Sequence, residues 1–558
     1  MFKFRLRHIG CLLLLFLVAS CGVNKGLHNR PDISKYNAAI PERITINDST
    51  FHAGNSFLTK NKQGLWELYV EGDPLERGLL TGSLTKALMD KQEAVFFNKI
   101  NEMLPSTSWQ NFLGKFLSWY NRKMYLHVPE EYKAEIYGVS RFASGEFDYM
   151  ASPYLRALYL HSAHDIGHAL QDLALVGCTS FAVWDDKTED GNLLLARNFD
   201  FYAGDAFAEE KIIAFVNPSE GYPFMSVTWG GMIGVVSGIN NQGLTVTINA
   251  AKSKIPLIAK TPISIVTREI LQYASTIEEA VAIAKKREVF VSEAILVGSA
   301  KDKRAVSIEV APNNFGVYDV ANSSELICSN HFQSDVYSND RRNLQSIAES
   351  HTQYRYERMK ELLDKNDKIS PKKAVAILRN KEGLNDKDIG FGNEKALNQL
   401  LAHHGIVFKP AELKVWVSSN PYQLGEFVAY DLNTIFTNRN GNPLAESLAQ
   451  TSLAIAEDPF VSSVAYKDYE AYRVLERAVE SAIANKEKIL PVTITELQAK
   501  NPNYWKAYYL SGKYYLQQGY EAAALKAFEK ANSLEITTKP DREEVEKYIA
   551  KLRRKLKQ

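Results

Sequence analysis

One cysteine, Cys178, is followed closely in the chain by an arginine and an aspartate that could serve it chemically. It precedes an apolar run, residues 181–184, and a turn rich in Asp and Gly separates this run from a second one, residues 193–196. The second run leads into Arg197 and Asp200. The two runs predict a β-hairpin, which would return both charges towards the cysteine and tune the pKa of its thiol. Such a thiol can attack the carbonyl carbon of an amide or thioester.

The base that would activate this thiol is not evident from its neighbours, since no histidine follows Cys178 closely. If the chain is cut just before Cys178, the new α-amine can act as the base, because such amines titrate near pH 8. Arg197 and Asp200 could then hold amine and thiolate in register. A downstream histidine such as His331 could instead serve a papain-like peptidase, which would need no cut.

Three histidines precede Cys178 on a predicted helix, at spacings of three and four residues that place them on one face: His161, His164 and His168. Such a face could bind a metal ion. It could equally be a polar packing face. Asp165 is the one carboxylate evident beside it that could support a metal ligand. We therefore predict no metal and no cofactor.

The first 20 residues have the pattern of a secretory signal peptide. Basic residues precede an apolar stretch at 11–18, and Val18-Ala19-Ser20-Cys21 forms a lipobox. The apolar stretch is short for a membrane-spanning helix. We predict a bacterial lipoprotein that is lipidated on Cys21. Residues 21–59 would then form a tether plus an entry strand. Gly22 gives no signal for inner-membrane retention, so the predicted location is the cell envelope, at the outer membrane.

Two cysteines remain beyond the leader, Cys178 and Cys328. An oxidising compartment favours a disulfide between them. A chain of this length does not depend on one bridge, because a large domain buries ample apolar surface. The apolar run at residues 326–329 makes Cys328 typical of a small core residue, which leaves Cys178 as the candidate nucleophile.

The overall composition is that of a folded globular protein: 45% hydrophobic, 11% aromatic and a net charge of +1. It has no nucleic-acid-binding signature. Residues 60–177 are mostly helical in pattern, with one strand at 64–72 and helices at 75–104, 109–126, 130–144 and 150–175. Short strands and two helices follow Cys178, so the pattern predicts a layered α+β fold. The predicted strands lie at 211–216, 225–229, 234–239, 244–248, 294–298, 305–310 and 315–321, and the helices at 261–273 and 276–286.

Residues 460–558 form a helical, charged tail. Within it, residues 506–536 resemble a single tetratricopeptide repeat, on the packing positions Tyr508, Gly512, Tyr515, Gly519, Ala524, Phe528 and Ala531. One repeat cannot bury its own apolar face, so flanking helices at 468–484 and 542–556 must complete it. The tail could bind a protein partner or cap the catalytic domain.

Several motifs between about residues 60 and 445 resemble one enzyme family. They are residues 72–78 (GDPLERG), 177–180 (GCTS), 197–200 (RNFD), 238–244 (GINNQGL) and 329–332 (SNHF). At this order and spacing they resemble the peptidase C45 family of autoproteolytic acyltransferases and amide hydrolases, named after the penicillin acyltransferases. More distantly the sequence is similar to acid ceramidase, N-acylethanolamine acid amidase and choloylglycine hydrolases.

The resemblance implies an αββα N-terminal-nucleophile sandwich with a helical pro-segment. It implies self-cleavage between Gly177 and Cys178, leaving an α-chain (residues 60–177) and a catalytic β-chain (residues 178–450) associated as a heterodimer. Cys178 would cut the chain and then act as the nucleophile. Arg197 would bind substrate or thiolate, and Asp200 would hydrogen-bond the amine or thiol.

The resemblance also implies oxyanion-hole donors at Asn249 and Asn330, although these residues could simply close a strand and cap a turn. It implies a late active-site arginine, for which Arg341 and Arg355 both qualify. The Arg355-Tyr356 pair slightly favours Arg355. Both arginines could instead be surface charges on a helix.

The function that follows is cleavage of a linear N-acyl amide through a thioester on Cys178. Water is the abundant acceptor outside the cytoplasm, so hydrolysis is preferred to acyl transfer onto an amine. A non-catalytic scaffold that retains the fold and holds a partner through its tail is the competing hypothesis. An apolar acyl pocket could be lined by aromatic residues near the site, which are as often core: Trp184, Phe199, Phe201, Tyr202 and Trp229.

Overall fold

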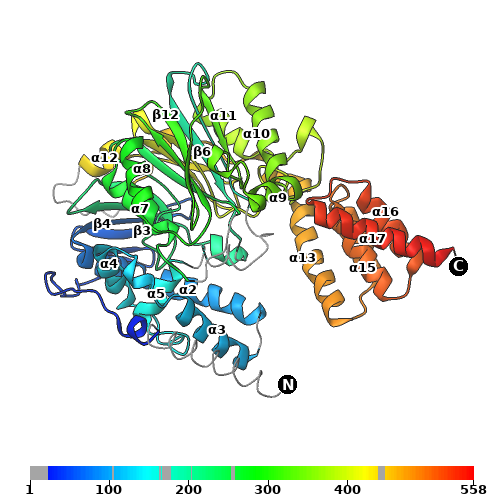
Figure 1. The fold of residues 1–558 in the computed structure, drawn as a ribbon, viewed down its shortest axis with the longest axis horizontal. Helices are drawn as coiled ribbons and strands as arrows, with labels where there is room; N and C mark the ends of the chain where they lie inside the picture. The colour runs from blue at the N-terminus through cyan, green and yellow to red at the C-terminus, as the bar shows by residue number, and fades with distance from the viewer. Residues whose placement is uncertain are drawn as a thin grey trace, which may run out of the picture.

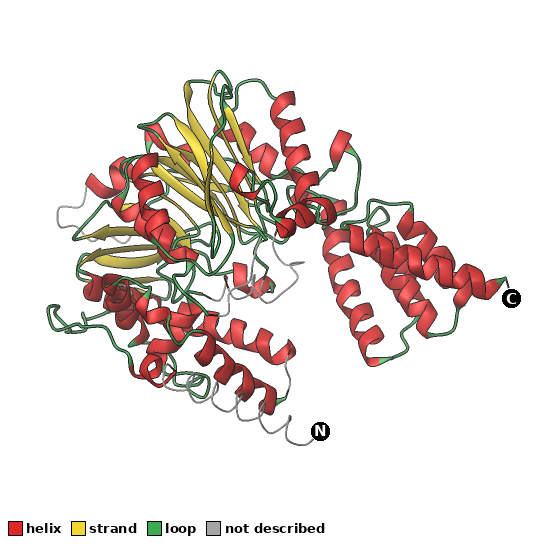
Figure 2. Ribbon diagram, in the orientation of Figure 1, coloured by secondary structure: helices red, strands yellow, loops and turns green. Residues whose placement is uncertain are grey.

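The computed structural model describes residues 23–103, 106–162, 165, 177–202, 204–252, 258–437 and 446–557. Within these residues, two β-sheets lie at the centre of the main body, with helices on their outer sides (Figures 1 and 2). The C-terminal helices stand beside this body (Figure 1).

The larger sheet joins strands from both sides of Cys178. It is antiparallel except between β4 and β7, which run parallel. The segment before Cys178 and the segment after it therefore share one sheet, which would hold them together after a cut. In spatial order its strands are β1 (Ile44–Asn47), β2 (Thr50–Ala53), β3 (Ser56–Lys60), β4 (Trp66–Gly72), β7 (Ile212–Pro218), β8 (Phe224–Thr228), β9 (Ser237–Asn240), β10 (Leu244–Ala250), β11 (Glu293–Ser299), β12 (Arg304–Val310) and β13 (Phe315–Tyr318).

The smaller sheet is antiparallel throughout and contains the predicted hairpin as β5 and β6. The hairpin turns between Asp185 (φ 49°) and Gly191 (φ 75°), and the left-handed backbone at both positions suits a tight turn. In spatial order the strands are β14 (Glu325–Cys328), β5 (Thr179–Asp185), β6 (Gly191–Phe199), β15 (His404–Lys409), β16 (Lys414–Ser418) and β17 (Phe427–Asp431).

Alternate residues of β6 contact different layers, as the period of two in a strand requires. Leu193 and Leu195 belong to the core between the two sheets. Leu194 and Ala196 belong to a second core, which includes the buried faces of α10 and α11. A third core joins the other side of the larger sheet to α2, α4, α7 and α8. Helices, sheet, sheet and helices thus form four layers, and the predicted αββα sandwich is confirmed.

Most predicted helices form near their expected bounds. α2 and α4 cross closely at two glycines, since a Cβ added to Gly138 would lie 2.7 Å from the carbonyl carbon of Gly78. Of the helix predicted at 150–175, α5 covers the first part, and most of the remainder lies outside the described residues. The α-helices of the main body are α2 (Pro74–Met103), α3 (Thr107–Tyr120), α4 (Glu130–Ser140), α5 (Pro153–Leu160), α7 (Ile263–Tyr273), α8 (Ile277–Lys286), α9 (Arg341–Glu349), α10 (Thr352–Lys365), α11 (Pro371–Leu378) and α12 (Leu432–Thr437).

Residues 21–59 were predicted as a tether plus an entry strand. The structure has three strands there, β1, β2 and β3, which extend the larger sheet beyond β4. These strands have four or five residues each, too few for alternation to register in the sequence. The leader and Cys21 lie outside the described residues. Among the helices of the described chain, none combines the length and the apolar character that a membrane span requires.

The C-terminal region has a core of its own, to which Leu400 and Leu424 of the main body also contribute. Gly512 lies against Phe528, since an added Cβ would come within 2.8 Å of that ring. This close packing joins the two helices of the proposed repeat, and the tetratricopeptide assignment itself stays a prediction. The helices are α13 (Val464–Asn485), α14 (Pro491–Lys500), α15 (Trp505–Gln517), α16 (Glu521–Asn532) and α17 (Lys539–Leu556).

Candidate active site

Cys178 lies immediately before β5 and is 1% exposed. Its side chain belongs to the core that joins the larger sheet to α2, α4, α7 and α8. Both Cys178 and Cys328 are free, so the alternative disulfide is not formed. Burial raises the pKa of the Cys178 thiol above its ordinary value, while the positive charge of Arg197 acts in the opposite direction.

Arg197 brings a positive charge to the cysteine from the neighbouring strand. On β6 it pairs with Ser180 of β5, which places it diagonally from Cys178. One Nη atom lies 3.6 Å from Cys178 Sγ. The other donates to the carbonyl oxygen of Val236 and to Ser237 Oγ, both at 2.6 Å. Arg197 thus spans the two sheets, and these bonds hold its guanidinium beside the thiol.

Asp200 follows β6 and is fully buried. Burial raises the pKa of its carboxyl to about 7, although the charges of Arg355 and Arg197 lower it. Its Oδ1 accepts a hydrogen bond from Gln423 at 3.4 Å, and its Oδ2 has no hydrogen-bond partner among the described residues. Its backbone carbonyl accepts from the N–H of Gly177 at 3.3 Å. A carboxyl that titrates near neutrality beside a thiol is suited to accept and return a proton.

Arg355 reaches the same place from α10 and is fully buried. Its Nη1 lies 2.7 Å from the carbonyl oxygen of Gly177, 2.8 Å from that of Cys178 and 2.5 Å from Thr179 Oγ1. Its Nη2 donates to Asn330 Oδ1 at 2.6 Å. Burial lowers the pKa of Arg355 to about 10, so it remains charged at neutral pH.

Asn249 and Asn330 lie at the site, but their side-chain amides are already used. Asn249 Nδ2 donates to the carbonyls of Cys328 and Ser329, at 3.0 and 3.3 Å, and its Oδ1 accepts from Ser180 Oγ at 2.9 Å. Asn330 Nδ2 donates to the carbonyl of Ala250 at 2.8 Å. In this arrangement the two side chains join strands and orient Arg355, and neither amide N–H is directed at the Gly177 carbonyl.

Arg341 and His331 have other surroundings. Arg341 is exposed at the first residue of α9, so of the two arginines Arg355 is the one that the fold brings to Cys178. His331 Nδ1 lies 3.0 Å from Thr352 Oγ1, and the His331 ring packs near the ring of Tyr356. Burial and, to a smaller extent, the charge of Arg355 lower the pKa of His331 to about 4.

Two residues of the site escaped the sequence reasoning. His351 Nδ1 accepts a hydrogen bond from Arg355 Nε at 3.0 Å, and its position four residues before Arg355 on a helix was a usable signal. Gln399 Nε2 donates to the carbonyl oxygen of Gly177 at 2.9 Å. It follows Gly177 by 222 residues, and nothing local in the sequence marks it.

Of the three histidines considered as metal ligands, His161 is described and His164 and His168 lie outside the described residues. His161 is buried, with its Nδ1 at 2.7 Å from the carbonyl of Ala157. Its Nε2 accepts from the N–H of Ile233 at 3.0 Å. Both ring nitrogens of His161 therefore form hydrogen bonds with backbone groups.

An apolar pocket opens near the site, between α2, α5 and the segment 229–232. Phe201, which stacks on Phe199 at 5.9 Å, connects the pocket to Arg197, whose guanidinium lies 4.4 Å from the centre of the Phe199 ring. Of the five aromatic residues considered from the sequence, Phe201 and Trp229 line it. The lining comprises Met89, Gln92, Glu93, Phe96, Ala143, Ala157, Leu160, Phe201, Phe207, Trp229, Gly230, Gly231 and Met232.

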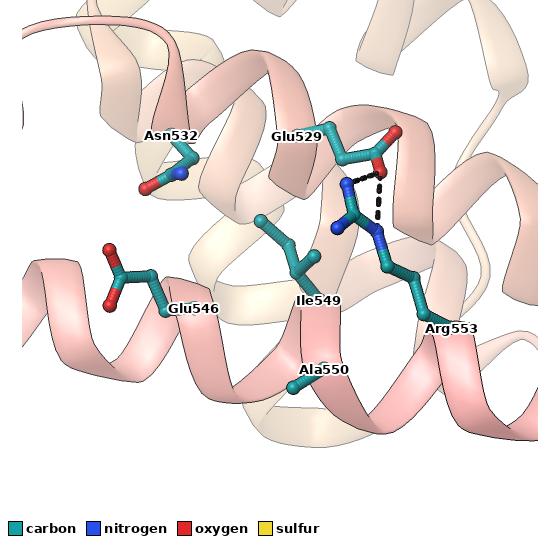
Figure 3. A pocket seen from close by; sticks show the side chains of 6 residues that line it. All are labelled: Glu529, Asn532, Glu546, Ile549, Ala550 and Arg553. Carbon is teal, nitrogen blue, oxygen red and sulfur yellow. Dashed lines mark hydrogen bonds and ion pairs between the residues drawn. The ribbon is translucent and has the colours of Figure 1, made fainter.

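A second hollow lies on the C-terminal region, between α16 and α17 (Figure 3). Its side chains include the ion pair between Glu529 and Arg553, at 2.6 Å. None of the residues that line it is a nucleophile, and it shares no element with Cys178. The candidate active site is therefore the cluster around Cys178.

Comparison with known proteins finds a family model that is similar to most of this cluster. Residues 187–420 match the family model described as acyl-coenzyme A:6-aminopenicillanic acid acyl-transferase. The matched segment includes Arg197, Asp200, Asn249, Asn330 and Arg355, and Cys178 precedes it. A protein of Archaeoglobus fulgidus named only as uncharacterised is 27% identical over 274 residues, which are 46% of this chain and 45% of that protein. The chain thus spans less than half the length of this curated relative.

Two solved structures are also similar. The N-acylethanolamine-hydrolyzing acid amidase ortholog of Caenorhabditis elegans is 18% identical, with a TM-score of 0.31 over 42% of this chain and 93% of its own. A mutant of the conjugated bile acid hydrolase of Clostridium perfringens is 14% identical, with a TM-score of 0.31 over 46% of this chain and 93% of its own. Residues 187–420, which are less than half of this chain, are therefore similar to the acyl-coenzyme A:6-aminopenicillanic acid acyl-transferase family.

Proposed function

We propose that this protein is an N-terminal-nucleophile amidohydrolase that cuts its own chain at Gly177–Cys178 and then uses Cys178 as its nucleophile. The observation that carries the proposal is the position of Cys178: its thiol lies 3.6 Å from Arg197 Nη2, while the adjoining Gly177 carbonyl is held by Arg355 at 2.7 Å. Nucleophile and scissile carbonyl are thus both bound by charged groups that favour attack.

Self-cleavage begins when the Cys178 thiol gives its proton to Asp200 and attacks the Gly177 carbonyl carbon. The S–C bond forms, the C–N bond between Gly177 and Cys178 breaks, and the proton passes to the leaving amine. Water then hydrolyses the thioester. The products are a Gly177 carboxylate and a Cys178 with a free thiol and a free α-amine.

In substrate turnover the α-amine of Cys178 acts as the base, because an α-amine titrates near pH 8. The thiolate attacks the substrate amide and expels its amine, which leaves a thioester on Cys178 that water hydrolyses. Arg197 stabilises the thiolate by its charge. Asp200 holds the α-amine, for which its Oδ2 has acceptor capacity.

The substrate is a linear N-acyl amide whose acyl group enters the apolar pocket that Phe201 and Trp229 line. Such a pocket favours an apolar acyl chain. Acyl transfer onto an amine is the second candidate function, because the matched family model is that of an acyl-transferase. Hydrolysis is preferred because water is the abundant acceptor in the proposed compartment.

The proposed location rests on the leader. A signal peptide over residues 1–20 and lipidation of Cys21 would anchor the enzyme in the cell envelope, at the outer membrane. The C-terminal helices would lie beside the catalytic domain, where they could also bind a protein partner. Labelling of cells with a radioactive fatty acid tests the lipid anchor, and loss of label in Cys21→Ala is the expected result.

The experiment that tests the function is the intact mass and N-terminal sequence of the purified protein beside its Cys178→Ala variant. Two chains in the wild type, one of them beginning at Cys178, and one uncut chain in the variant are expected. Cys328→Ala is the matched control, because this second buried cysteine has no predicted chemical role, and it should still be cut. One uncut chain in all three proteins would contradict the proposal.

Turnover is tested on the cut protein with a series of N-acyl amides. Release of free acid would support hydrolysis, and partition of the thioester between water and an added amine separates the two candidate functions. Dominant aminolysis at modest amine concentration would overturn the preference for hydrolysis. A cut protein that turns over no N-acyl amide would favour the scaffold hypothesis.

A further inference from the structure

The carbonyl oxygen of Gly177 has a second donor besides Arg355. Gln399 Nε2 lies 2.9 Å from this oxygen, and Arg355 Nη1 lies 2.7 Å from it. The Gln399 side chain is 2% exposed, so water does not compete for its amide. Two buried N–H donors on one carbonyl oxygen form the geometry that stabilises an oxyanion.

Gly177 is the residue type that this contact requires. A Cβ added there would lie 2.0 Å from Gln399 Nε2 and 2.7 Å from its Cδ. Any side chain at position 177 would therefore displace the Gln399 amide from the carbonyl.

The segment that carries Gln399 follows α11 and is held by the C-terminal helices. Tyr469 of α13 donates through its hydroxyl to the carbonyl of Leu400, the residue next to Gln399, at 3.2 Å. Glu535, between α16 and α17, accepts from Lys395 Nζ at 2.6 Å, and its carbonyl accepts from Asn393 Nδ2 at 2.9 Å. The tail therefore packs on the same short segment that reaches the scissile peptide.

The packing is close enough to leave this segment little freedom. Gly390 lies against Tyr504, where an added Cβ would come within 2.5 Å of the tyrosine backbone. The side chain of Asn501 exchanges two hydrogen bonds with the backbone of Phe391, at 3.1 and 2.8 Å. Leu400 itself adopts a left-handed backbone (φ 52°), a conformation that a leucine keeps only when its surroundings impose it.

We propose that Gln399 is a catalytic residue of self-cleavage, whose amide stabilises the oxyanion of Gly177, and that the C-terminal helices position it. The proposal rests on the proposed function, because it requires attack by Cys178. When the Cys178 Sγ–C bond forms, the C=O π electrons move onto the Gly177 oxygen. Gln399 and Arg355 donate to that oxygen until the C–N bond breaks and the carbonyl re-forms as a thioester.

The test follows cleavage during cell-free synthesis of the full chain by gel and mass spectrometry. Gln399→Met removes the donor at similar volume and should slow cleavage about a hundredfold, as loss of one oxyanion donor does. Gln399→Glu should also be slow at neutral pH. Its rate relative to wild type should recover as the pH falls, because a protonated glutamate donates again. A lost packing contact would show no such recovery.

The positioning role is tested with Tyr469→Phe, which removes the hydroxyl that binds the Leu400 carbonyl. It should slow cleavage about fivefold, the effect of one net hydrogen bond, and should have no further effect when combined with Gln399→Met. The matched control is Tyr520→Phe, at an exposed tyrosine of the same region, which should cut at the wild-type rate.

The outcomes separate this proposal from the proposed function. A wild type that remains uncut contradicts the proposed function itself. If the wild type is cut, and the folded Gln399→Met variant is cut at a rate within threefold of the wild-type rate, only the role of Gln399 is overturned. If neither Gln399 variant folds, Tyr469→Phe alone decides: slower cleavage supports the role and an unchanged rate overturns it. If Tyr469→Phe slows cleavage equally in the wild-type and the Gln399→Met backgrounds, the positioning role is overturned.

Discussion

Arg355 binds the carbonyl oxygen of Gly177 across 178 residues of chain, at 2.7 Å from Nη1. The other guanidinium nitrogens also donate to named acceptors, Nε to His351 Nδ1 and Nη2 to Asn330 Oδ1. Because the guanidinium is planar and its N–H groups point in fixed directions, these bonds set both the place and the angle of the charge. α10 thereby acts on the peptide bond at the start of β5.

Replacement of Arg355 by lysine should slow self-cleavage at least tenfold, because a lysine ammonium cannot reproduce the separate donor directions of Nε, Nη1 and Nη2 from one point. Arg341→Lys is the matched control at the exposed start of α9 and should behave as wild type. Cleavage during cell-free synthesis measures both, and the thermal midpoints of the two proteins show that they are folded. Equal rates for the two variants would contradict the assignment of Arg355.

The rate of self-cleavage should rise with pH through about 7, because Asp200, whose pKa burial raises to about 7, must be ionised to accept the thiol proton. Asp200→Asn should remove this rise and slow the reaction about a hundredfold, within the range of general-base contributions. A pH profile of the cleavage rate measures it. A profile of Asp200→Asn that still rises through neutrality would exclude this carboxyl as the base.

The same carboxyl predicts the sign of a stability change. Its folded pKa, about 7, exceeds the ordinary value of 3.8, so between these values the folded protein binds more protons than the unfolded one. The free energy of unfolding should therefore fall as the pH rises from about 4 to about 7. Urea unfolding in the uncut Cys178→Ala background measures it, and Asp200→Asn should flatten the fall. An unchanged slope would contradict the raised pKa.

Asn249→Ala should lower the free energy of unfolding by about 1–3 kcal/mol, because it removes the acceptor of the buried Ser180 hydroxyl and a donor to two backbone carbonyls. Urea unfolding in the Cys178→Ala background is the measurement. The effect on self-cleavage should be small in comparison, since the Asn249 amide already donates to Cys328 and Ser329. A hundredfold slower cleavage with unchanged stability would support the oxyanion role instead.

Trp229→Ala should enlarge the apolar pocket and shift the preference of the cut enzyme to longer acyl groups. The ratio of kcat/KM between N-acyl amides of increasing acyl length measures the shift. Tyr202→Ala is the matched control, because this neighbouring aromatic residue bonds to Asp205 and is not part of the pocket lining. An unchanged length profile in Trp229→Ala would exclude the pocket as the acyl site.

Prediction from the sequence was best where the signal was local. The β5–β6 hairpin could be predicted because its apolar runs and its turn lie within about 20 residues, a range over which turn chemistry and alternation act together. α2 could be predicted because its apolar residues recur over many turns. For the segment of β1, β2 and β3 the sequence predicted a tether plus one entry strand, because strands of four or five residues contain too few alternations to be distinguished from coil.

The sequence by itself indicated which residues are candidates for the chemistry: a cysteine before a strand, with an arginine and an aspartate at the end of the next one. Its period-two and helical patterns predicted a layered α+β fold, and the resemblance of its motifs to a known family implied the αββα arrangement. Only the tertiary structure decided between Arg341 and Arg355, and only it brought Gln399 to Gly177. Such contacts join segments about 180 or 220 residues apart, and they depend on packing between layers, which local sequence does not encode.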